Sequence, residues 1–486
     1  MVFSNGVFLF LFLPIALFVY YSPFCKNIKV KNSWLLLISL GFYAWGEPIY
    51  ILLMLLSIFV NWILGKWVSV YPKTSKGKKI VAISCIYNLG VLFVFKYVSW
   101  LLGSFGLVDK NSPIAQIALP IGISFYTFQA LSYVIDVYRG KEQAQENILD
   151  VGLYIAFFPQ LIAGPIVRYG TISRQLRERK HSFDMFCDGV WRFSIGLSKK
   201  LLLSNQLAVA ADLAFGRNAG ERSVVFAWFG ALAFMLQIYF DFSGYSDMAI
   251  GLGKMFGFEF LENFNYPYVS RSITEYWRRW HISLGEWFRD YLYYPLSFGP
   301  AIKVRKAAAQ KWGRKTAGIV SSAFSLFIVW MATGIWHGAN WTFVVWGLIQ
   351  FVFIFWEQYR KPLKNEKFGN VVAFITTFLV ILFTKVIFKA DSISHAVHYY
   401  ASMLHLSGNN WVDEYGIYWI GQYKSFLVIG LIFSFPVLEC ITKCIRNKRV
   451  KMIWNIGEAV VMCFLLVLNI CYAVSGGYNP FIYFNF

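Results

Sequence analysis

The chain has 486 residues, of which 58% are hydrophobic and only 14% are charged, and its formal net charge is +20. A soluble domain is close to a quarter charged, so this composition excludes an ordinary soluble protein and predicts an integral membrane protein. The basic residues occur in short clusters between apolar runs. Such clusters orient membrane spans and contact anionic lipid headgroups, so membrane lipid is an expected partner and nucleic acid is not.

The apolar runs predict an all-α, polytopic membrane protein with about eleven transmembrane helices, since each run is long enough to cross a bilayer. The predicted spans cover residues 6–22, 33–46, 48–65, 80–103, 114–138, 224–248, 318–336, 341–357, 371–388, 425–441 and 453–474. Shorter or interrupted segments lie at 151–167 and 186–215. No repeat or linker marks a second domain, so a single transmembrane domain over 1–486 is predicted.

The basic loops predict an orientation. The segment 1–22 lacks a basic n-region and a cleavage site, which indicates a first helix that is retained. Basic clusters at 26–31, 66–79 and 139–141 fall on every second loop, which places these loops in the cytoplasm. Both the N-terminus and the C-terminus are then extracytoplasmic, in a multi-pass protein of the cell (plasma or inner) membrane.

Two regions do not fit a simple crossing. The segment 151–167 has basic loops on both sides and contains Pro159, Gly164 and Pro165, which interrupt a helix. A re-entrant segment is predicted, because irregular backbone at membrane depth must be surrounded by protein or water. The basic region 268–315 predicts cytoplasmic amphipathic helices that dip into a funnel. One apolar stripe is expected there at helical spacing, formed by Trp277, Trp280, Leu284, Trp287 and Phe288.

Two histidines are the candidate catalytic residues, because an ionisable side chain at membrane depth is costly. His337 follows an apolar run and lies between Trp336 and Asn340. A desolvated imidazole stays neutral, which suits a general base, and the tryptophan would exclude water. The alternative is a histidine that caps a helix end near the outer interface.

His281 is the second candidate, within the sequence YWRRWHISLGEWF. Trp280 precedes it, and Arg278 and Arg279 could contact the phosphates of an anionic donor. The alternative is an interfacial helix with an ordinary aromatic belt.

Other polar residues are weaker candidates for the lining of a substrate tunnel. Asp241 and Tyr245 lie in the apolar span YFDFSGYSD, and Asn265 lies in ENFNYPYVS. For Asp241, an internal ion pair that fixes helix packing is at least as good an explanation as a catalytic role. The sequence contains no HExxH motif, P-loop or dinucleotide fingerprint, so no metal and no bound cofactor are expected.

At these residues the chain resembles the membrane-bound O-acyltransferase (MBOAT) family, and within it the branch of the alginate O-acetylation membrane protein. The resemblance runs over nearly the whole length. It is carried by MVFSNGVFLFLFLPI, PIGISFYTFQALSYVIDVYRG, FFPQLIAGPIVR, QIYFDFSGYSDMAIGLGKMFGF, NFNYPYVSRSITEYWRRWHISLGEWFRDYLYYPL, TGIWHGANWTFVVWG and the terminal NPFIYFNF.

The resemblance implies a ring of helices around a central tunnel, with a catalytic core at roughly 114–360. It implies that His337 is the catalytic histidine and that His281 occupies a second family position. The implied donor is a cytoplasmic thioester, acetyl-CoA. The implied acceptor is an exported polysaccharide, usually reached through a separate extracytoplasmic acetyltransferase.

Two alternatives remain open. The first is D-alanyl transfer to teichoic acid, against which the whole-length match counts. The second is a transporter that exports a polymer or lipid without acyl chemistry, although the sequence lacks the half-repeat symmetry common in transporters.

Overall fold

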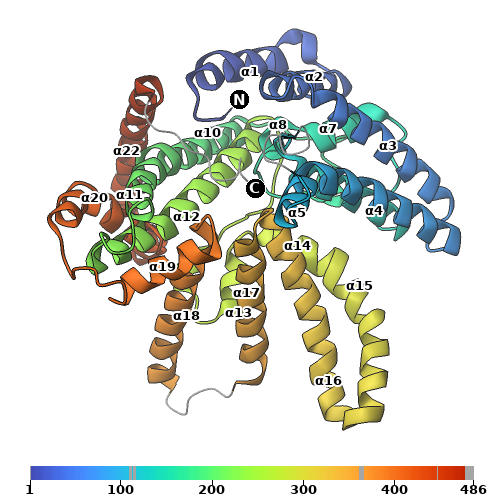
Figure 1. Ribbon diagram of the computed structural model, residues 1–486. Coiled ribbons are helices and arrows are strands. Elements are labelled where there is room, and N and C mark those ends of the chain that lie inside the picture. Colours follow the sequence, from blue (N-terminus) through green and yellow to red (C-terminus); the bar gives the residue numbers. More distant parts are fainter. Residues whose placement is uncertain (1, 109–111, 113–116, 361–365, 446, 477–486) are drawn as a thin grey trace. The chain divides into compact units, whose positions relative to one another are not determined.

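The computed structural model describes residues 2–108, 112, 117–360, 366–445 and 447–476 (Figure 1). All regular elements of the described residues are helices, as predicted. Eight of the described helices are long and apolar enough to span a membrane, so the predicted count of about eleven stays a prediction. The start of the predicted span 114–138, the loop residues Lys361 and Lys364, and the terminal motif at 479–486 lie outside the described residues.

The chain divides into two compact units, and the first comprises Met1–Leu197 and Tyr245–Glu262. Within it, α6 packs against both α3 and α4, and α7 packs against α2. Its helices are η1 (Phe8–Phe12), α1 (Leu13–Tyr21), η2 (Pro23–Cys25), α2 (Ile28–Gly46), α3 (Ile51–Val70), α4 (Ser75–Lys96), α5 (Val98–Ser104), α6 (Ile123–Tyr138), α7 (Ile148–Ala156), α8 (Phe158–Leu161), α9 (Tyr169–Ile172) and α10 (Phe183–Ser198).

The predicted interruption at 151–167 is present in the first unit. Helix α7 ends at Ala156, because Phe157 leaves the helical region with ψ of 113°, and α8 lasts four residues. Every side chain of 151–167 is buried. The surrounding protein therefore shields this irregular backbone, as the sequence argument requires.

The second unit comprises Ser198–Gly244 and Asn263–Phe486. The second segment of α16 packs against α17, and α17 also contacts α13 and α18 (Figure 1). Its helices are η3 (Lys199–Ser204), α11 (Asn205–Phe215), the first part of α12 (Val224–Met255), η4 (Pro267–Val269), α13 (Ile273–Arg279), α14 (Ile282–Phe288), η5 (Arg289–Tyr293), α15 (Tyr294–Ser297), α16 (Pro300–His337), α17 (Trp341–Tyr359), α18 (Glu366–Lys389), α19 (Ile393–Met403), α20 (Glu414–Phe433), α21 (Val437–Cys444) and α22 (Lys448–Ser475).

One predicted span in this unit has wrong boundaries, and one predicted break is present. The span predicted at 425–441 is instead α20, which begins at Glu414 and ends at Phe433, before Pro436. Proline lacks the backbone N–H that a continuing helix needs, although the apolar run itself goes on. The helix predicted for the basic residues before the span at 318–336 is present, because a kink at Gly313, where φ is 82°, divides α16 into two helical segments.

Candidate active site

His337 is the last residue of α16, and its side chain is 2% exposed. Its imidazole ring lies 5.0 Å from the ring of Trp346 on α17 and 5.3 Å from that of Phe388 on α18, measured between centroids. The helix ends because Gly338 is extended. A Cβ atom at this glycine would lie 2.3 Å from the Phe343 ring, so only glycine permits the close approach. His337 therefore ends a helix as the alternative supposed, but inside the protein and not at an exposed interface.

His281 lies at a break between two short helices. Helix α13 ends at Arg279, Trp280 is extended, and His281 adopts the left-handed conformation (φ 46°, ψ 53°) before α14 begins. A non-glycine residue in this conformation is uncommon and is found preferentially at functional sites. The single helical stripe predicted from Trp277 to Phe288 is therefore wrong, because the helix is interrupted at the histidine.

Asn263 fixes the tautomer of His281. The Asn263 Oδ1 atom accepts hydrogen bonds from the backbone N–H and the hydroxyl of Ser283, at 3.1 and 2.9 Å. The same oxygen lies 3.2 Å from His281 Nδ1. Because the Ser283 N–H can only donate, the Asn263 atom is an acceptor, and Nδ1 of His281 must carry the proton. The Nε2 atom then has the lone pair.

Burial keeps the His281 imidazole neutral. The side chain is completely buried, and this desolvation lowers the pKa of His281 from 6.5 to about 3. The Phe242 ring packs edge-on against it at a centroid distance of 4.6 Å. At physiological pH, His281 is therefore a neutral hydrogen-bond acceptor at Nε2.

The two predicted histidines share one neighbour. The Trp336 ring lies 6.0 Å from the ring of His281 and 5.1 Å from that of His337, and its side chain is 4% exposed. Residues 56 positions apart in the sequence thus belong to one buried cluster. Hereafter the histidine cluster means His281, His337, Trp336, Trp346 and Phe388.

Helix α17 holds α13 in place next to this cluster. The Glu357 carboxylate accepts hydrogen bonds from the backbone N–H groups of Ile273 and Thr274, at 2.6 and 2.9 Å. A carboxylate is stabilised at this position because it meets the unpaired N–H groups and the positive dipole at the start of a helix. Gln350, also on α17, accepts a hydrogen bond of 3.0 Å from the Trp277 indole.

The other residues predicted near the histidines have separate surroundings. Trp280 is 1% exposed, and its ring stacks on the Tyr276 ring at a centroid distance of 5.6 Å. Arg278 is exposed, and Arg279 forms an ion pair with Glu275 at 3.0 Å. The side chain of Asn340 caps α17 by accepting from Thr342 N–H, at 3.1 Å.

The other polar residues predicted for the tunnel lining each have their own contacts. Asp241 forms a buried ion pair with Lys200 at 2.6 Å in the second unit, which supports the packing interpretation. Tyr245 belongs to the first unit, where its ring stacks on Phe3 at 4.6 Å. Asn265 is exposed, and its backbone N–H binds the Arg279 carbonyl at 2.9 Å.

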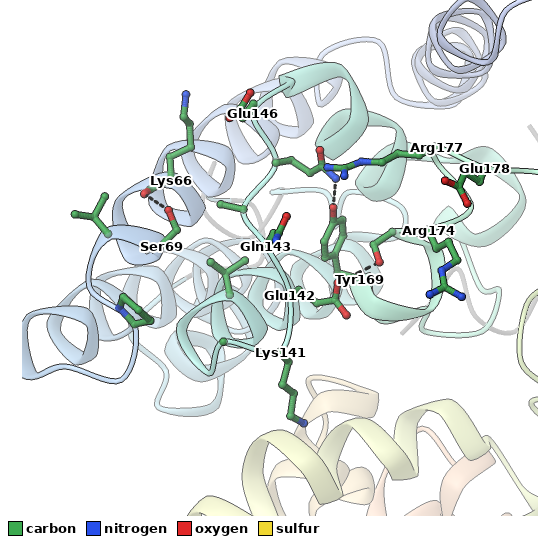
Figure 2. A pocket seen from close by; sticks show the side chains of 17 residues that line it. Lys66, Ser69, Lys141, Glu142, Gln143, Glu146, Tyr169, Arg174, Arg177 and Glu178 are labelled. Atoms are coloured by element: carbon green, nitrogen blue, oxygen red, sulfur yellow. Dashed lines mark hydrogen bonds between the residues drawn. The ribbon is translucent and has the colours of Figure 1, made fainter.

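A cavity of about 1030 Å³ lies in the first unit (Figure 2). It is lined by residues from three segments at or next to the basic clusters that were predicted as cytoplasmic: 66–72, 137–146 and 169–178. Its basic side chains are Lys66, Lys141, Arg174 and Arg177, and its acidic side chains are Glu142, Glu146 and Glu178.

Comparison with known proteins establishes the family. Residues 144–388 match the membrane-bound O-acyltransferase family. The chain is 35% identical to the probable alginate O-acetylase AlgI of Pseudomonas putida, and the alignment covers 100% of both chains. It is 29% identical to the peptidoglycan O-acetyltransferase of Helicobacter pylori, over 100% of this chain and 98% of the relative. The teichoic acid D-alanyltransferase of Bacillus subtilis is 26% identical over 57% of this chain and 70% of the relative.

The chain therefore belongs to the membrane-bound O-acyltransferase family, as its motifs predicted. Within the family, it falls in the branch of the alginate O-acetylases. It is a multi-pass membrane enzyme that catalyses O-acyl transfer.

Proposed function

We propose that this protein takes an acetyl group from acetyl-CoA on the cytoplasmic side and passes it across the membrane for O-acetylation of an exported or cell-envelope polysaccharide. The observation that carries this proposal is the burial of His281 and His337 around the shared Trp336 ring. The alginate and peptidoglycan acetylation named for the full-length relatives supports a polysaccharide acceptor.

In the proposed reaction, His337 is the general base. It takes the proton of the acceptor hydroxyl while the hydroxyl oxygen forms a bond to the thioester carbonyl carbon, and the carbonyl electrons move onto oxygen. When this intermediate collapses, the C–S bond breaks and the sulfur leaves with the bonding electrons. The His337 imidazolium then returns its proton to the thiolate, so that the products are an ester and a thiol.

His281 has a different part in this proposal. With the proton on Nδ1 and a lone pair on Nε2, it accepts a hydrogen bond and orients the acceptor hydroxyl. A neutral acceptor cannot stabilise the negative charge that develops on the carbonyl oxygen, so that charge requires another group.

The predicted orientation places both termini outside the cell membrane. The cavity of the first unit supports this orientation, because the three segments that line it lie at or next to the basic clusters predicted as cytoplasmic. Its lysine and arginine side chains suit a donor that carries phosphates. The acceptor end of the reaction would then face outward, toward an extracytoplasmic acetyltransferase or toward the polysaccharide itself.

The direct test uses the purified full-length protein in lipid nanodiscs with radiolabelled acetyl-CoA. His337→Ala should abolish acetyl transfer while the protein stays folded. His398→Ala is the matched control, since His398 is an exposed histidine of the same unit. Retained transfer by His337→Ala would contradict the proposed role.

The identity of the transferred group needs a separate measurement. Mass spectrometry of the modified polymer should show acetyl and not D-alanyl groups. A transporter would be indicated by two results together: the wild type transfers no acyl group, and cells with His337→Ala still export the polymer.

A further inference from the structure

Lys385 is buried in α18, close to the histidine cluster. Its side chain is 3% exposed, although it lies in a helix apolar enough to span a membrane. A lysine near a helix end normally extends its ammonium group toward water, as the partly exposed Lys389 does one turn later. The position of Lys385 near the helix end therefore does not explain why its ammonium group is buried.

The other deeply buried lysine of this unit shows what is unusual about Lys385. Lys200 has a carboxylate partner, Asp241, at 2.6 Å. Within the described part of the chain, Lys385 forms no ion pair with a carboxylate. Its ammonium instead lies 4.1 Å from the centroid of the Trp280 ring and 5.2 Å from that of Phe388.

Aromatic faces compensate only part of a buried charge. A desolvated cation–π contact offsets less free energy than the burial of an ion costs. An ammonium group in such surroundings keeps a strong attraction for a negative charge that enters the site. A folded protein retains such a group where a ligand or a reacting atom supplies the opposite charge.

The same two aromatic rings connect Lys385 to the predicted catalytic residues. Phe388 also contacts His337, at 5.3 Å between ring centroids. Trp280 immediately precedes His281 in the chain. Lys385 is thus a cation one ring away from His337 and in contact with the residue next to His281, whereas Arg278 is exposed and Arg279 is paired with Glu275.

We propose that the Lys385 ammonium group binds the acyl carbonyl oxygen and stabilises the negative charge that develops on it. This inference rests on the proposed function. When the acceptor oxygen bonds to the thioester carbon, the carbonyl electrons move onto oxygen, and a Lys385 N–H donates a hydrogen bond to that oxyanion. The electrons return as the C–S bond breaks, the proton taken by His337 goes to the thiolate, and Lys385 keeps all its protons. Lys385 would supply the charge stabilisation that the neutral His281 cannot.

The test compares Lys385→Met and Lys385→Arg with Lys389→Met in nanodiscs. Lys389 is the matched control, because it lies one turn away and is paired with Asp212 at 2.7 Å outside the histidine cluster. For each variant, kcat, the KM for acetyl-CoA and the KM for the acceptor are measured with a neutral oligosaccharide and with a uronate oligosaccharide, together with the unfolding temperature.

We expect Lys385→Met to lower kcat by about 10²–10³-fold with both acceptors, the loss typical of a removed oxyanion donor. The KM for acetyl-CoA should stay unchanged, and the unfolding temperature should not fall, because an apolar side chain of similar size replaces a buried charge. Lys385→Arg should recover part of kcat, and Lys389→Met should match the wild type.

Three results would overturn the inference. The first is an unchanged kcat in Lys385→Met, and the second is a loss of kcat that merely follows a lower unfolding temperature. The third is a rise in the KM for the acceptor that occurs only with the uronate oligosaccharide, which would assign Lys385 to a substrate carboxylate. His337→Ala is assayed in parallel to separate the two proposals. An inactive His337→Ala beside a fully active Lys385→Met refutes the Lys385 role alone, whereas an active His337→Ala refutes the proposed function.

Discussion

The Oδ1 atom of Asn263 lies 3.2 Å from Nδ1 of His281 and holds this histidine in one tautomer. Asn263 can do so because Ser283 donates two hydrogen bonds to the same oxygen and thereby fixes the orientation of the amide. The backbone supports this arrangement, since Ile282 N–H binds the Asn263 carbonyl at 3.0 Å. The chemistry of one buried imidazole therefore depends on a residue 18 positions earlier in the chain.

Asn263→Leu should impair transfer by removing this control. The variant leaves the Nδ1 proton of His281 and the Ser283 N–H without their acceptor, at a cost of about 1–3 kcal/mol for a buried polar group. We expect kcat to fall by at least about tenfold, since Nε2 is no longer held as the acceptor. We would measure kcat and the unfolding temperature of this variant and compare them with those of the control Asn447→Ala, which alters the N-cap of α22. Wild-type kcat in Asn263→Leu would show that the tautomer of His281 does not matter.

The stability of the protein should depend on pH through His281. The folded-state pKa of about 3 lies below the ordinary 6.5, so between these values the unfolded state binds a proton that the folded state does not. The contribution is fully present above pH 6.5 and is lost as the pH falls toward the folded-state pKa.

The measurement is the unfolding temperature of wild type and His281→Asn between pH 6.5 and about 5, where the wild type should lose stability more steeply. His181, whose pKa burial lowers to about 4, adds the same slope to both proteins and cancels in the comparison. Parallel curves would mean that His281 is not buried in a neutral state.

Gly347→Ala should separate α16 from α17 and disturb His337. A Cβ atom at Gly347 would lie 2.5 Å from the Trp330 carbonyl oxygen and 3.2 Å from Cα of Gly334. Such overpacking costs about 1–3 kcal/mol. We expect a lower unfolding temperature together with reduced transfer, because Trp346, adjacent to Gly347, contacts His337. Gly421→Ala is the matched control in α20, where the added Cβ meets nothing within 4 Å. Equal behaviour of the two variants would refute the close packing.

Variants of the ion pair between Lys200 and Asp241 can distinguish a structural role of Asp241 from a catalytic one. Lys200→Met removes the cation that is ion-paired with the buried Asp241 carboxylate and should destabilise the protein by about 3–5 kcal/mol. The double variant Lys200→Met, Asp241→Leu should recover most of this stability, because both charges are gone. If Asp241 only fixes packing, the double variant transfers acetyl groups at close to the wild-type kcat. A stable but inactive double variant would instead give Asp241 a part in the reaction.

Features that depend on the local backbone could be predicted from the sequence, whereas the conformation and contacts of the buried site residues could not. The interruption within 151–167 was predicted correctly, because Pro159, Gly164 and Pro165 act on their own backbone. The stripe from Trp277 to Phe288 was wrong, since the apolar spacing cannot reveal that His281 adopts a left-handed conformation. Lys385 was overlooked within the predicted span 371–388, although a lysine inside an apolar run is itself a signal.

The helical membrane class, the places where most helices lie, and the two candidate histidines could be predicted from the amino-acid sequence. These follow from hydropathy and residue type within short segments, which act on the chain locally. The folded protein was needed to show that Trp336 contacts both His281 and His337, that Asn263 sets the tautomer of His281, and that Lys385 contacts Trp280 without a carboxylate partner among the described residues. Burial, tautomer and charge compensation depend on contacts between residues far apart in the chain, which local patterns do not contain.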